Sequence, residues 1–224
     1  MDSAFHSFPH KESLALFLES LYNPLLLHYN GHMVIYKSFN NPKLTELIRA
    51  GGIGVIPTDT IYGLVCSASD KEAVEKIFEI KGRDMGKPPI ILISDTAELK
   101  SFGVTLSERQ LEFLKKNWPG TVSVVLPTSS DKLDYLSRGL GTLTFRLPKE
   151  NKLISLLQKT GPLIAPSANL QSQEPAHNID EVMNYFIGQI DFVVDGGEIV
   201  GKSSTLVDLT GSSPKVLRQG DAKI

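Results

Sequence analysis

Hydrophobic and polar positions alternate along this chain in blocks that are typical of an α/β protein. Short apolar runs, which predict buried strands, alternate with longer stretches in which apolar residues recur at helical spacing. The succession becomes regular at Pro42, where a helix over 42–50 is predicted to end at Gly51-Gly52 and to lead into a strand over 53–57. Because the interleaving continues without a linker or a change in composition, we predict one α/β domain over residues 33–224.

The later elements repeat this pattern. Helices are predicted over residues 70–81, 107–117, 152–159 and 179–187. Strands are predicted over residues 89–93, 121–126, 143–147, 163–165, 191–195, 204–208 and 215–218. Asp70 and Asn178 are predicted N-caps, and Ser107 and Gln110 have the spacing of a capping box.

Residues 1–32 differ from this pattern and are treated as an N-terminal extension. Their apolar residues recur at roughly helical spacing between Leu14 and Tyr22, and Asn23-Pro24 would end such a helix. No basic start followed by an apolar core is present in the first residues, and no apolar run is long enough to cross a membrane. We therefore expect a cytoplasmic protein without a membrane partner.

Composition narrows the function classes. Of 224 residues, 41% are hydrophobic and 21% are charged, as in an ordinary globular protein. The formal net charge of −2 argues against a broad basic surface, so weak or no direct nucleic acid binding is expected. The single cysteine, Cys66, excludes an internal disulfide and a cysteine-based metal cluster, and no other metal ligand set is predicted.

The most informative stretch is 57–64, Pro-Thr-Asp-Thr-Ile-Tyr-Gly-Leu, which follows the apolar run 53–56. A buried strand leads here into hydroxyl and carboxyl side chains and then into a predicted Tyr-Gly turn. Polar groups at the end of a buried strand are costly to place unless something binds them. Ligands of open α/β folds also bind at strand ends. The stretch is therefore a candidate ligand site, with an ordinary strand-to-turn junction as the alternative.

Two further segments offer cations. In an extended loop, Lys81 and Arg83 would point the same way and could grip one polyphosphate, although a solvated basic loop would show the same residues. Arg146 lies within an apolar strand, where burial requires an anionic partner such as a substrate carboxylate. The alternative places Arg146 on a wet face of that strand. Thr142, just before the strand, offers a hydroxyl and a backbone N–H.

Small and hydroxyl residues mark two more candidate segments. In 165–169, Ala-Pro-Ser-Ala-Asn, small residues allow a ligand to approach, but the glycines of a nucleophile elbow are missing. In 201–205, Gly-Lys-Ser-Ser-Thr resembles a phosphate loop, but a strand follows it where such a loop requires a helix. These patterns argue against a serine hydrolase and a Walker-type NTPase.

The order of these segments resembles the YrdC-like family of threonylcarbamoyl-adenylate synthases, in its short, single-domain form, over about residues 43–220. Seven ordered motifs carry the resemblance: 57–64, Lys-x-Arg at 81–83 with Lys87-Pro88, Trp-Pro-Gly-Thr at 118–121, Arg-Leu-Pro at 146–148, Pro-Ser-Ala-Asn at 166–169, Ser-Ser-Thr-Leu-Val-Asp at 203–208 and Leu-Arg-Gln-Gly at 217–220. The resemblance implies a YrdC-like α/β fold, a twisted mixed sheet with flanking helices around a large concave cavity.

The resemblance also implies a reaction and roles for individual residues. L-Threonine, bicarbonate and ATP, with Mg²⁺ accompanying the nucleotide, would give threonylcarbamoyl-AMP and pyrophosphate. A separate tRNA threonylcarbamoyl transferase complex would use the product. By similarity, the threonine contacts are Thr58, Arg146, Ala165 and Ser204, the ATP contacts are Lys81, Arg83, Thr142, Ser167, Asn169 and Arg218, and the catalytic charges are Lys81 and Arg83.

The chain departs from the family pattern at several positions, including Pro89 where a leucine is more usual. Residues 170–178 lack a usual glycine and include Glu174, and Leu92 stands where some relatives carry a histidine, so that contact to threonine is not expected. Two other readings of the chain are kept as alternatives. One is a carbamoyl-adenylate-forming module, and the other is a non-catalytic RNA-binding module, for which the net charge is unfavourable.

Overall fold

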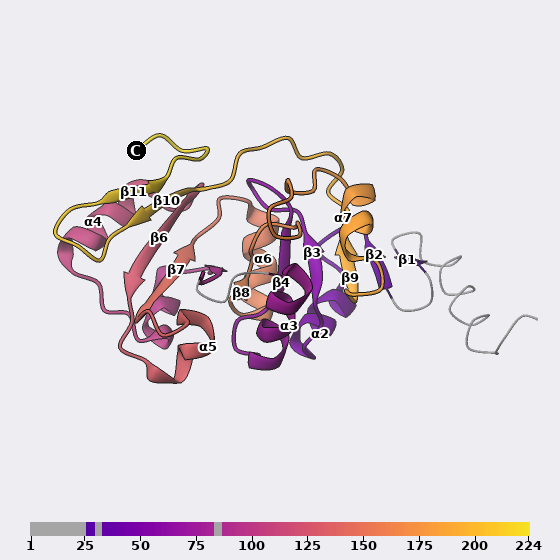
Figure 1. Ribbon diagram of the computed structural model, residues 1–224, viewed down its shortest axis with the longest axis horizontal. Helices are drawn as coiled ribbons and strands as arrows, with labels where there is room; N and C mark the ends of the chain where they lie inside the picture. The colour runs from indigo at the N-terminus through magenta and orange to yellow at the C-terminus, as the bar shows by residue number, and fades with distance from the viewer. Residues whose placement is uncertain (1–25, 30–32, 83–86) are drawn as a thin grey trace, which may run out of the picture.

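The computed structural model describes residues 26–29, 33–82 and 87–224. Within these residues the strands are β1 (Leu26–Tyr29), β2 (Met33–Tyr36), β3 (Gly54–Ile56), β4 (Gly63–Ser67), β5 (Ile90–Leu92), β6 (Val122–Pro127), β7 (Thr142–Arg146), β8 (Leu163–Ile164), β9 (Phe192–Val194), β10 (Thr205–Asp208) and β11 (Lys215–Arg218). They form one sheet in the order β1-β2-β9-β3-β4-β8-β5-β7-β6-β10-β11 (Figure 1). Its strand pairs are both parallel and antiparallel, which confirms the predicted mixed sheet.

The helices of the described chain are α2 (Pro42–Arg49), α3 (Lys71–Lys81), α4 (Glu108–Asn117), α5 (Asp134–Ser137), α6 (Asn151–Thr160) and α7 (Ile179–Phe186), with 3₁₀ turns η1 (Thr96–Phe102) and η2 (Asp131–Leu133). The predicted caps are confirmed. Asp70 accepts a hydrogen bond from the Ala73 N–H, Asn178 accepts one from the Glu181 N–H, and Ser107 forms a capping box with Gln110. No helix in these ranges is both long and apolar enough for a membrane span.

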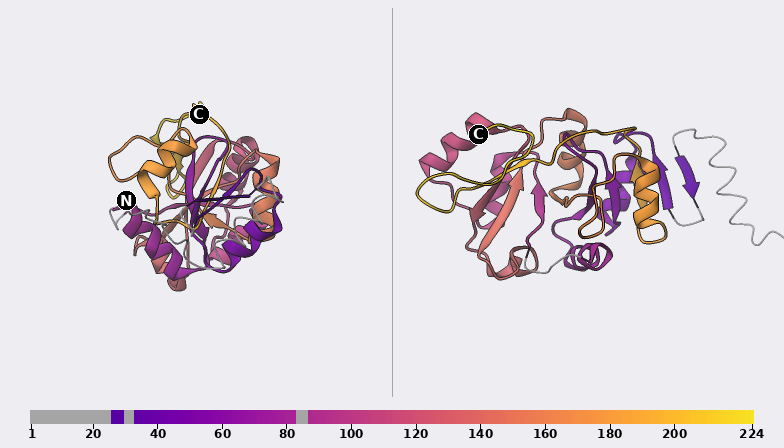
Figure 2. Two further views of the ribbon diagram at one scale, coloured as in Figure 1. Left: turned by 90° about the vertical axis from the view of Figure 1, so that its right-hand side faces the viewer. Right: turned by 45° about the horizontal axis from the view of Figure 1, so that its top comes forward.

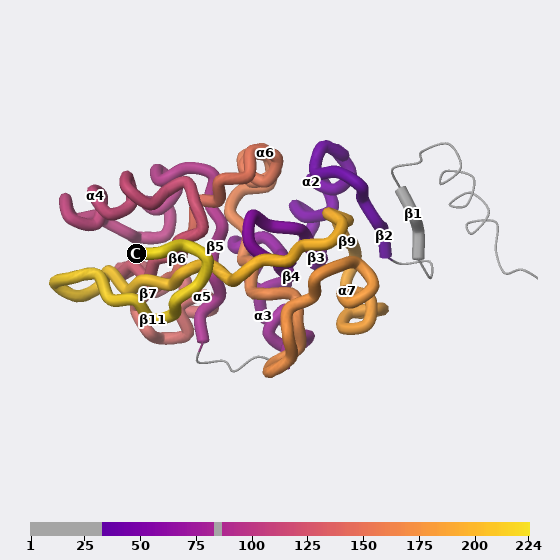
Figure 3. The backbone as a smooth tube through the Cα atoms, turned by 90° about the horizontal axis from the view of Figure 1, so that it is seen from above, coloured from indigo at the N-terminus to yellow at the C-terminus, as the bar shows by residue number. Residues whose placement is uncertain are grey.

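Helices cover both faces of the sheet, as the view from above shows (Figure 3). On one side, α2 and α6 pack against each other and bury Leu44 and Leu157 in a cluster with β-strand residues. On the other side, α3 and α7 contribute Ile77 and Phe186 to the larger cluster. Strands enclosed in this way are apolar on both faces, which is why they read as continuous hydrophobic runs in the sequence.

The region between β3 and β4 differs from the prediction. The predicted Tyr-Gly turn is wrong: the turn lies earlier, where the Thr58 N–H donates to the Ile61 carbonyl at 3.2 Å, and Gly63 already begins β4. The alternation that marks a half-exposed strand is missing from β4 because Leu64 and Val65 are both fully buried. The helix expected near residues 14–22 lies outside the described residues.

Residues 195–204, here called the crossover segment, connect distant parts of the sheet. β9 pairs with β2 and β3, whereas β10 pairs with β6 near the opposite edge. Between them the chain runs along one long side of the molecule (Figures 1 and 2). The crossover segment therefore carries Ser203 and Ser204 to the strand ends where the pocket lies.

Candidate active site

A pocket opens where six segments meet: the turn between β3 and β4, the start of β5, the end of β7, the exit of β8, the crossover segment and the end of β11. Its enclosed part measures about 80 Å³, within about 500 Å³ of space that opens to solvent. The lining residues are Thr58, Thr60, Ile61, Tyr62, Gly63, Ile90, Arg146, Ala165, Pro166, Ser167, Ser203, Ser204 and Arg218. Six of the predicted site residues are among them.

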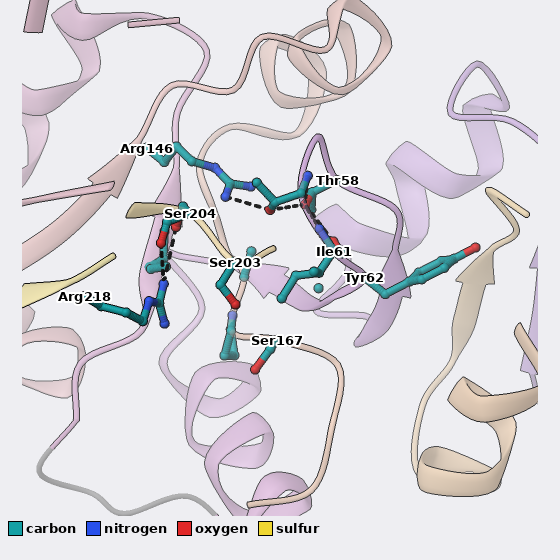
Figure 4. A pocket seen from close by; sticks show the side chains of 13 residues that line it. Thr58, Ile61, Tyr62, Arg146, Ser167, Ser203, Ser204 and Arg218 are labelled. Atoms are coloured by element: carbon teal, nitrogen blue, oxygen red, sulfur yellow. Dashed lines mark hydrogen bonds between the residues drawn. The ribbon is translucent and has the colours of Figure 1, made fainter. Parts of the chain in front are cut away.

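Arg146 is the central charge of the pocket (Figure 4). It is the last residue of β7 and only 4% exposed. Its Nη2 lies 3.0 Å from Asp59 Oδ1, and its Nη1 donates to Thr60 Oγ1 at 3.0 Å. Among the described residues, the Arg146 Nε finds no hydrogen-bond partner. One nitrogen of this buried cation thus lacks a partner in the described chain, and the wet-face alternative for Arg146 is excluded.

The electrostatic setting of Arg146 is strongly perturbed. Burial lowers the pKa of its guanidinium, the Asp59 carboxylate opposes this shift, and the nearby charge of Arg218 adds to it. Two positive groups held this close favour an anionic ligand, which would relieve both the desolvation and the repulsion.

The turn before Tyr62 fixes the hydroxyls that surround Arg146. Thr58 Oγ1 donates to the Ile61 carbonyl at 2.6 Å and lies 3.0 Å from Thr60 Oγ1. Because a hydroxyl has one hydrogen, Thr60 must donate to Thr58. The hydrogen bonds therefore run in one direction, from Arg146 through Thr60 and Thr58 to the backbone. Thr58 both lines the pocket and shapes the turn that holds Arg146.

Ser204 and Arg218 form the opposite wall. Ser204 Oγ lies 2.8 Å from Ser123 Oγ, and Arg218 Nη2 donates to the Ser204 carbonyl at 2.9 Å. Burial of its head group lowers the pKa of Arg218, although Arg218 stands on β11, whose four residues are all exposed. Arg218 as a whole is therefore more exposed to solvent than Arg146, although both line the pocket.

Lys81, by contrast, does not line the pocket. It is 3% exposed, and its Nζ donates to the carbonyls of Ser167 and Asn169 and to Asn169 Oδ1, each at 2.7 Å. Ser167 Oγ also donates to Asn169 Oδ1 at 2.7 Å. Lys81 therefore lies beneath the loop after β8 and holds it in shape. Arg83, its predicted partner, lies outside the described residues.

Thr142 is likewise separated from the pocket. It begins β7, where it pairs with Pro127, and Arg146 ends the same strand. At the usual rise of a strand, four residues span about 13 Å. The ATP contacts of Thr142, Lys81 and Arg83 stay predictions.

Asp59, Thr60 and Ser123 are among the polar residues of the site that carried no predicted role. Asp59 and Thr60 belong to the stretch 57–64, so the signal was the same excess of polar groups at a buried strand end. Ser123 is fully buried within β6 and bonded to Ser204. A serine inside a run of valines requires such a partner, and this requirement could have pointed to it.

No group of three or more His, Cys, Asp or Glu side chains placed to hold a metal ion occurs in the part of the chain that the structure describes. The charged residues that line the pocket are Arg146 and Arg218. Fold and pocket together define an α/β protein that offers two guanidinium groups and several hydroxyls to an anionic ligand.

Comparisons with known proteins agree with this class. A family model described as telomere recombination, and named for Sua5, YciO and YrdC, matches residues 46–220. The chain therefore belongs to the Sua5/YciO/YrdC family.

Curated relatives share one name. Threonylcarbamoyl-AMP synthase of Pyrococcus abyssi is 37% identical over 177 residues, which are 77% of this chain and 52% of the relative. The protein of the same name from Bacillus subtilis is 33% identical over 189 residues, 82% of this chain and 55% of the relative. A putative threonylcarbamoyl-AMP synthase of Mycobacterium tuberculosis is 30% identical, with 77% and 80% covered. The chain thus spans about half the length of the first two relatives.

Solved structures show the same fold. P. abyssi Sua5 in complex with L-threonine superimposes with a TM-score of 0.75 and 35% identity, covering 80% of this chain and 53% of that one. Escherichia coli YciO gives a TM-score of 0.74 and 28% identity, covering 81% and 89%. Thermococcus kodakarensis HypF, at 22% identity and a TM-score of 0.72, is similar in fold.

Proposed function

We propose that this chain is an L-threonylcarbamoyladenylate synthase, a nucleotidyltransferase that forms threonylcarbamoyl-AMP and pyrophosphate from L-threonine, bicarbonate and ATP. The observation that carries the proposal is the meeting of Arg146 and Arg218 at one pocket with the hydroxyls of Thr58 and Ser204. The names of its relatives and the threonine complex of P. abyssi Sua5 support this choice of substrates.

The threonine half of the proposal rests on Arg146. Its guanidinium is buried and held by Asp59 and Thr60, and its Nε has no hydrogen-bond partner among the residues that the structure describes. A carboxylate accepts such donors in short, charge-assisted hydrogen bonds. The small side chain of Ala165 and the hydroxyl of Ser204 would accommodate the remainder of the amino acid.

The nucleotide half rests on Arg218 and on the loop that carries Ser167. Arg218 reaches the open part of the pocket, where a triphosphate has room. Lys81 holds the Ser167–Asn169 backbone, and Thr142 and Arg83 would extend the contacts. The lining charges are cationic, so these residues fit phosphate, and Mg²⁺ would be held mainly by the triphosphate oxygens, whose charge it neutralises.

The reaction needs orientation and charge more than a protein nucleophile. The neutral amine of threonine attacks the carbon of bicarbonate, and loss of water leaves a carbamate. A carbamate oxygen then attacks the α-phosphorus of ATP, and pyrophosphate leaves. Positioning and electrostatic stabilisation dominate such phosphoryl chemistry. Burial raises the pKa of the Cys66 thiol, which therefore stays protonated and takes no part.

The product is a mixed anhydride that a second enzyme must consume. We propose that a separate transferase complex passes the threonylcarbamoyl group to tRNA, so that this chain itself needs little affinity for nucleic acid. Its net charge of −2 supports that division of tasks.

Pyrophosphate release tests the proposal. The chain is incubated with ATP, Mg²⁺ and bicarbonate and with each amino acid in turn, and the nucleotide product is identified by mass spectrometry. We expect release that requires both threonine and bicarbonate, with threonylcarbamoyl-AMP as the product. Release that depends on carbamoyl phosphate, or salt-dependent tRNA binding without any turnover, would contradict the proposal.

A further inference from the structure

Tyr62 belongs to the pocket wall, but its side chain leaves the pocket. Figure 4 shows the ring directed away from Arg146 and Arg218. The residue is completely buried. Its hydroxyl accepts a hydrogen bond from the Gly196 N–H at 2.9 Å and donates one to the Gly197 carbonyl at 2.8 Å. Tyr62 thus holds the start of the crossover segment through two hydrogen bonds from one atom.

The backbone of Tyr62 holds the facing wall of the pocket. The Tyr62 carbonyl accepts a hydrogen bond from the Ala168 N–H at 2.8 Å, and the neighbouring Gly63 forms an isolated bridge with Ser167. Tyr62 therefore contacts both segments. Its backbone carbonyl holds the loop after β8, and its side-chain hydroxyl holds the crossover segment.

The remainder of the crossover segment has few other attachments. The Ile199 N–H donates to the His177 carbonyl at 2.8 Å, and the His177 ring Nδ1 lies 2.9 Å from the Ile199 carbonyl. Gly201 runs so close to Thr60 that a Cβ there would overlap the Thr60 carbonyl oxygen. Val200 is 81% exposed. The path to Ser203 is therefore held at three points, by Tyr62 at Gly196 and Gly197, by His177 at Ile199 and by Thr60 at Gly201, and loss of the Tyr62 hydroxyl removes the first of them.

We propose that Tyr62 is a positioning residue of the pocket. Its hydroxyl sets the path of the crossover segment so that Ser203, Ser204 and, through the Ser204 carbonyl, Arg218 stand opposite Arg146. The inference rests on the proposed function as far as the ligands are concerned. It predicts that loss of the hydroxyl weakens ligand binding without touching the groups that meet the ligand.

The test compares Tyr62→Phe with Tyr135→Phe. Tyr135 is a matched control because its hydroxyl also donates to a backbone carbonyl, that of Ala68, at 2.8 Å, and it does not line the pocket. Tyr62→Phe removes two hydrogen bonds of about 1 kcal/mol each. We expect the KM for threonine to rise about tenfold and kcat to stay within about twofold of wild type. Tyr135→Phe should leave both constants unchanged.

A protease readout examines the segment itself. Lys202 is exposed and is the single Lys or Arg between residues 195 and 204. Trypsin should cut after Lys202 about tenfold faster in Tyr62→Phe, as followed by mass spectrometry. Gly201→Ala, which displaces the segment from its other side and leaves Tyr62 in place, should reproduce both the faster cleavage and the higher KM.

Two outcomes would overturn the inference, and a third would separate it from the proposed function. Wild-type cleavage at Lys202 in Tyr62→Phe would mean that the hydroxyl does not hold the segment. Equal changes in Tyr135→Phe would reduce the effect to general destabilisation. If wild type releases no pyrophosphate while Tyr62→Phe still exposes Lys202, the proposed function fails and the positioning of the segment stands, since the protease arm needs no turnover.

Discussion

The two arginines of the pocket occupy opposite kinds of environment. Arg146 ends the interior strand β7, is 4% exposed, and is held by Asp59 and Thr60. Arg218 ends the edge strand β11, whose residues are all exposed. Its Nη2 donates a hydrogen bond to the Ser204 carbonyl at 2.9 Å. Burial lowers the pKa of both guanidinium groups, and at Arg146 the Asp59 carboxylate opposes this shift.

This difference predicts different roles. A buried charge with fixed partners presents one geometry and so selects the shape of a small ligand. Arg218, an exposed residue at the end of an edge strand, has fewer fixed partners than Arg146 and can adjust to a flexible triphosphate. Substitution of Arg146 should therefore affect both stability and amino acid binding, and substitution of Arg218 should affect nucleotide binding alone.

The largest expected effect follows Arg146→Met. The substitution leaves Asp59 buried without its cation, which destabilises a protein by about 3–5 kcal/mol, and threonine binding should fall by roughly 100-fold or more. Chemical denaturation and calorimetric titration with threonine measure the two effects. The double variant Asp59→Asn/Arg146→Met removes the stranded charge and should recover much of the stability without recovering binding. Recovery of binding in the double variant would contradict the role of Arg146.

Lys81→Met should have the next largest effect. It removes the donor of three hydrogen bonds beneath the Ser167–Asn169 loop. We expect the adenylation rate, measured as pyrophosphate release at saturating substrates, to fall by roughly 10–100-fold, with a much smaller change in threonine affinity. Lys76→Met on the exposed side of the same helix is the matched control. An unchanged rate would remove Lys81 from the catalytic assignment.

Arg218→Gln should act more weakly and on one substrate. Since Arg218 is exposed and makes one close backbone contact, the free energy of unfolding should change by less than about 0.5 kcal/mol. The KM for ATP should rise by about tenfold, and the effect should shrink at high salt. A loss of threonine affinity as large as that of Arg146→Met would abolish the distinction between the two arginines.

The sequence anticipates the fold better than the division of roles within the pocket. Apolar periodicity and capping residues such as Asp70 are local signals, and they place most helices and strands correctly. β4 is not predicted because its apolar run, Leu64-Val65-Cys66, is short and directly follows the stretch that is predicted to be a Tyr-Gly turn. The motif at 57–64 points to the site, and the turn that Thr58 forms with Ile61 is a contact within that motif. Nothing local shows that Lys81 faces a loop 86 residues away, because that contact arises only once distant parts of the chain pack together.

The acidic partners differ in the same way as the two arginines, and a change at Asp195 should have the smallest effect of these substitutions. Unlike the buried Asp59, it pairs at the surface with Lys37, whose side chain is 42% exposed. The hydrogen bond from Lys37 lowers the pKa of Asp195. Because the folded pKa lies below the usual value of 3.8, the pair stabilises the fold above that pH and loses its contribution as pH falls through the lowered value.

Asp195→Asn should therefore reduce the free energy of unfolding by less than about 1 kcal/mol at neutral pH, since exposed pairs contribute little. The gap between wild type and variant should close as the pH falls through the lowered pKa of Asp195, and it should shrink at high salt. Urea unfolding across this pH range measures it, with Lys37→Met as the control that removes the same pair. A gap that persists at low pH would mean that Asp195 acts through its shape and its bond from the Gly197 N–H, not through its charge.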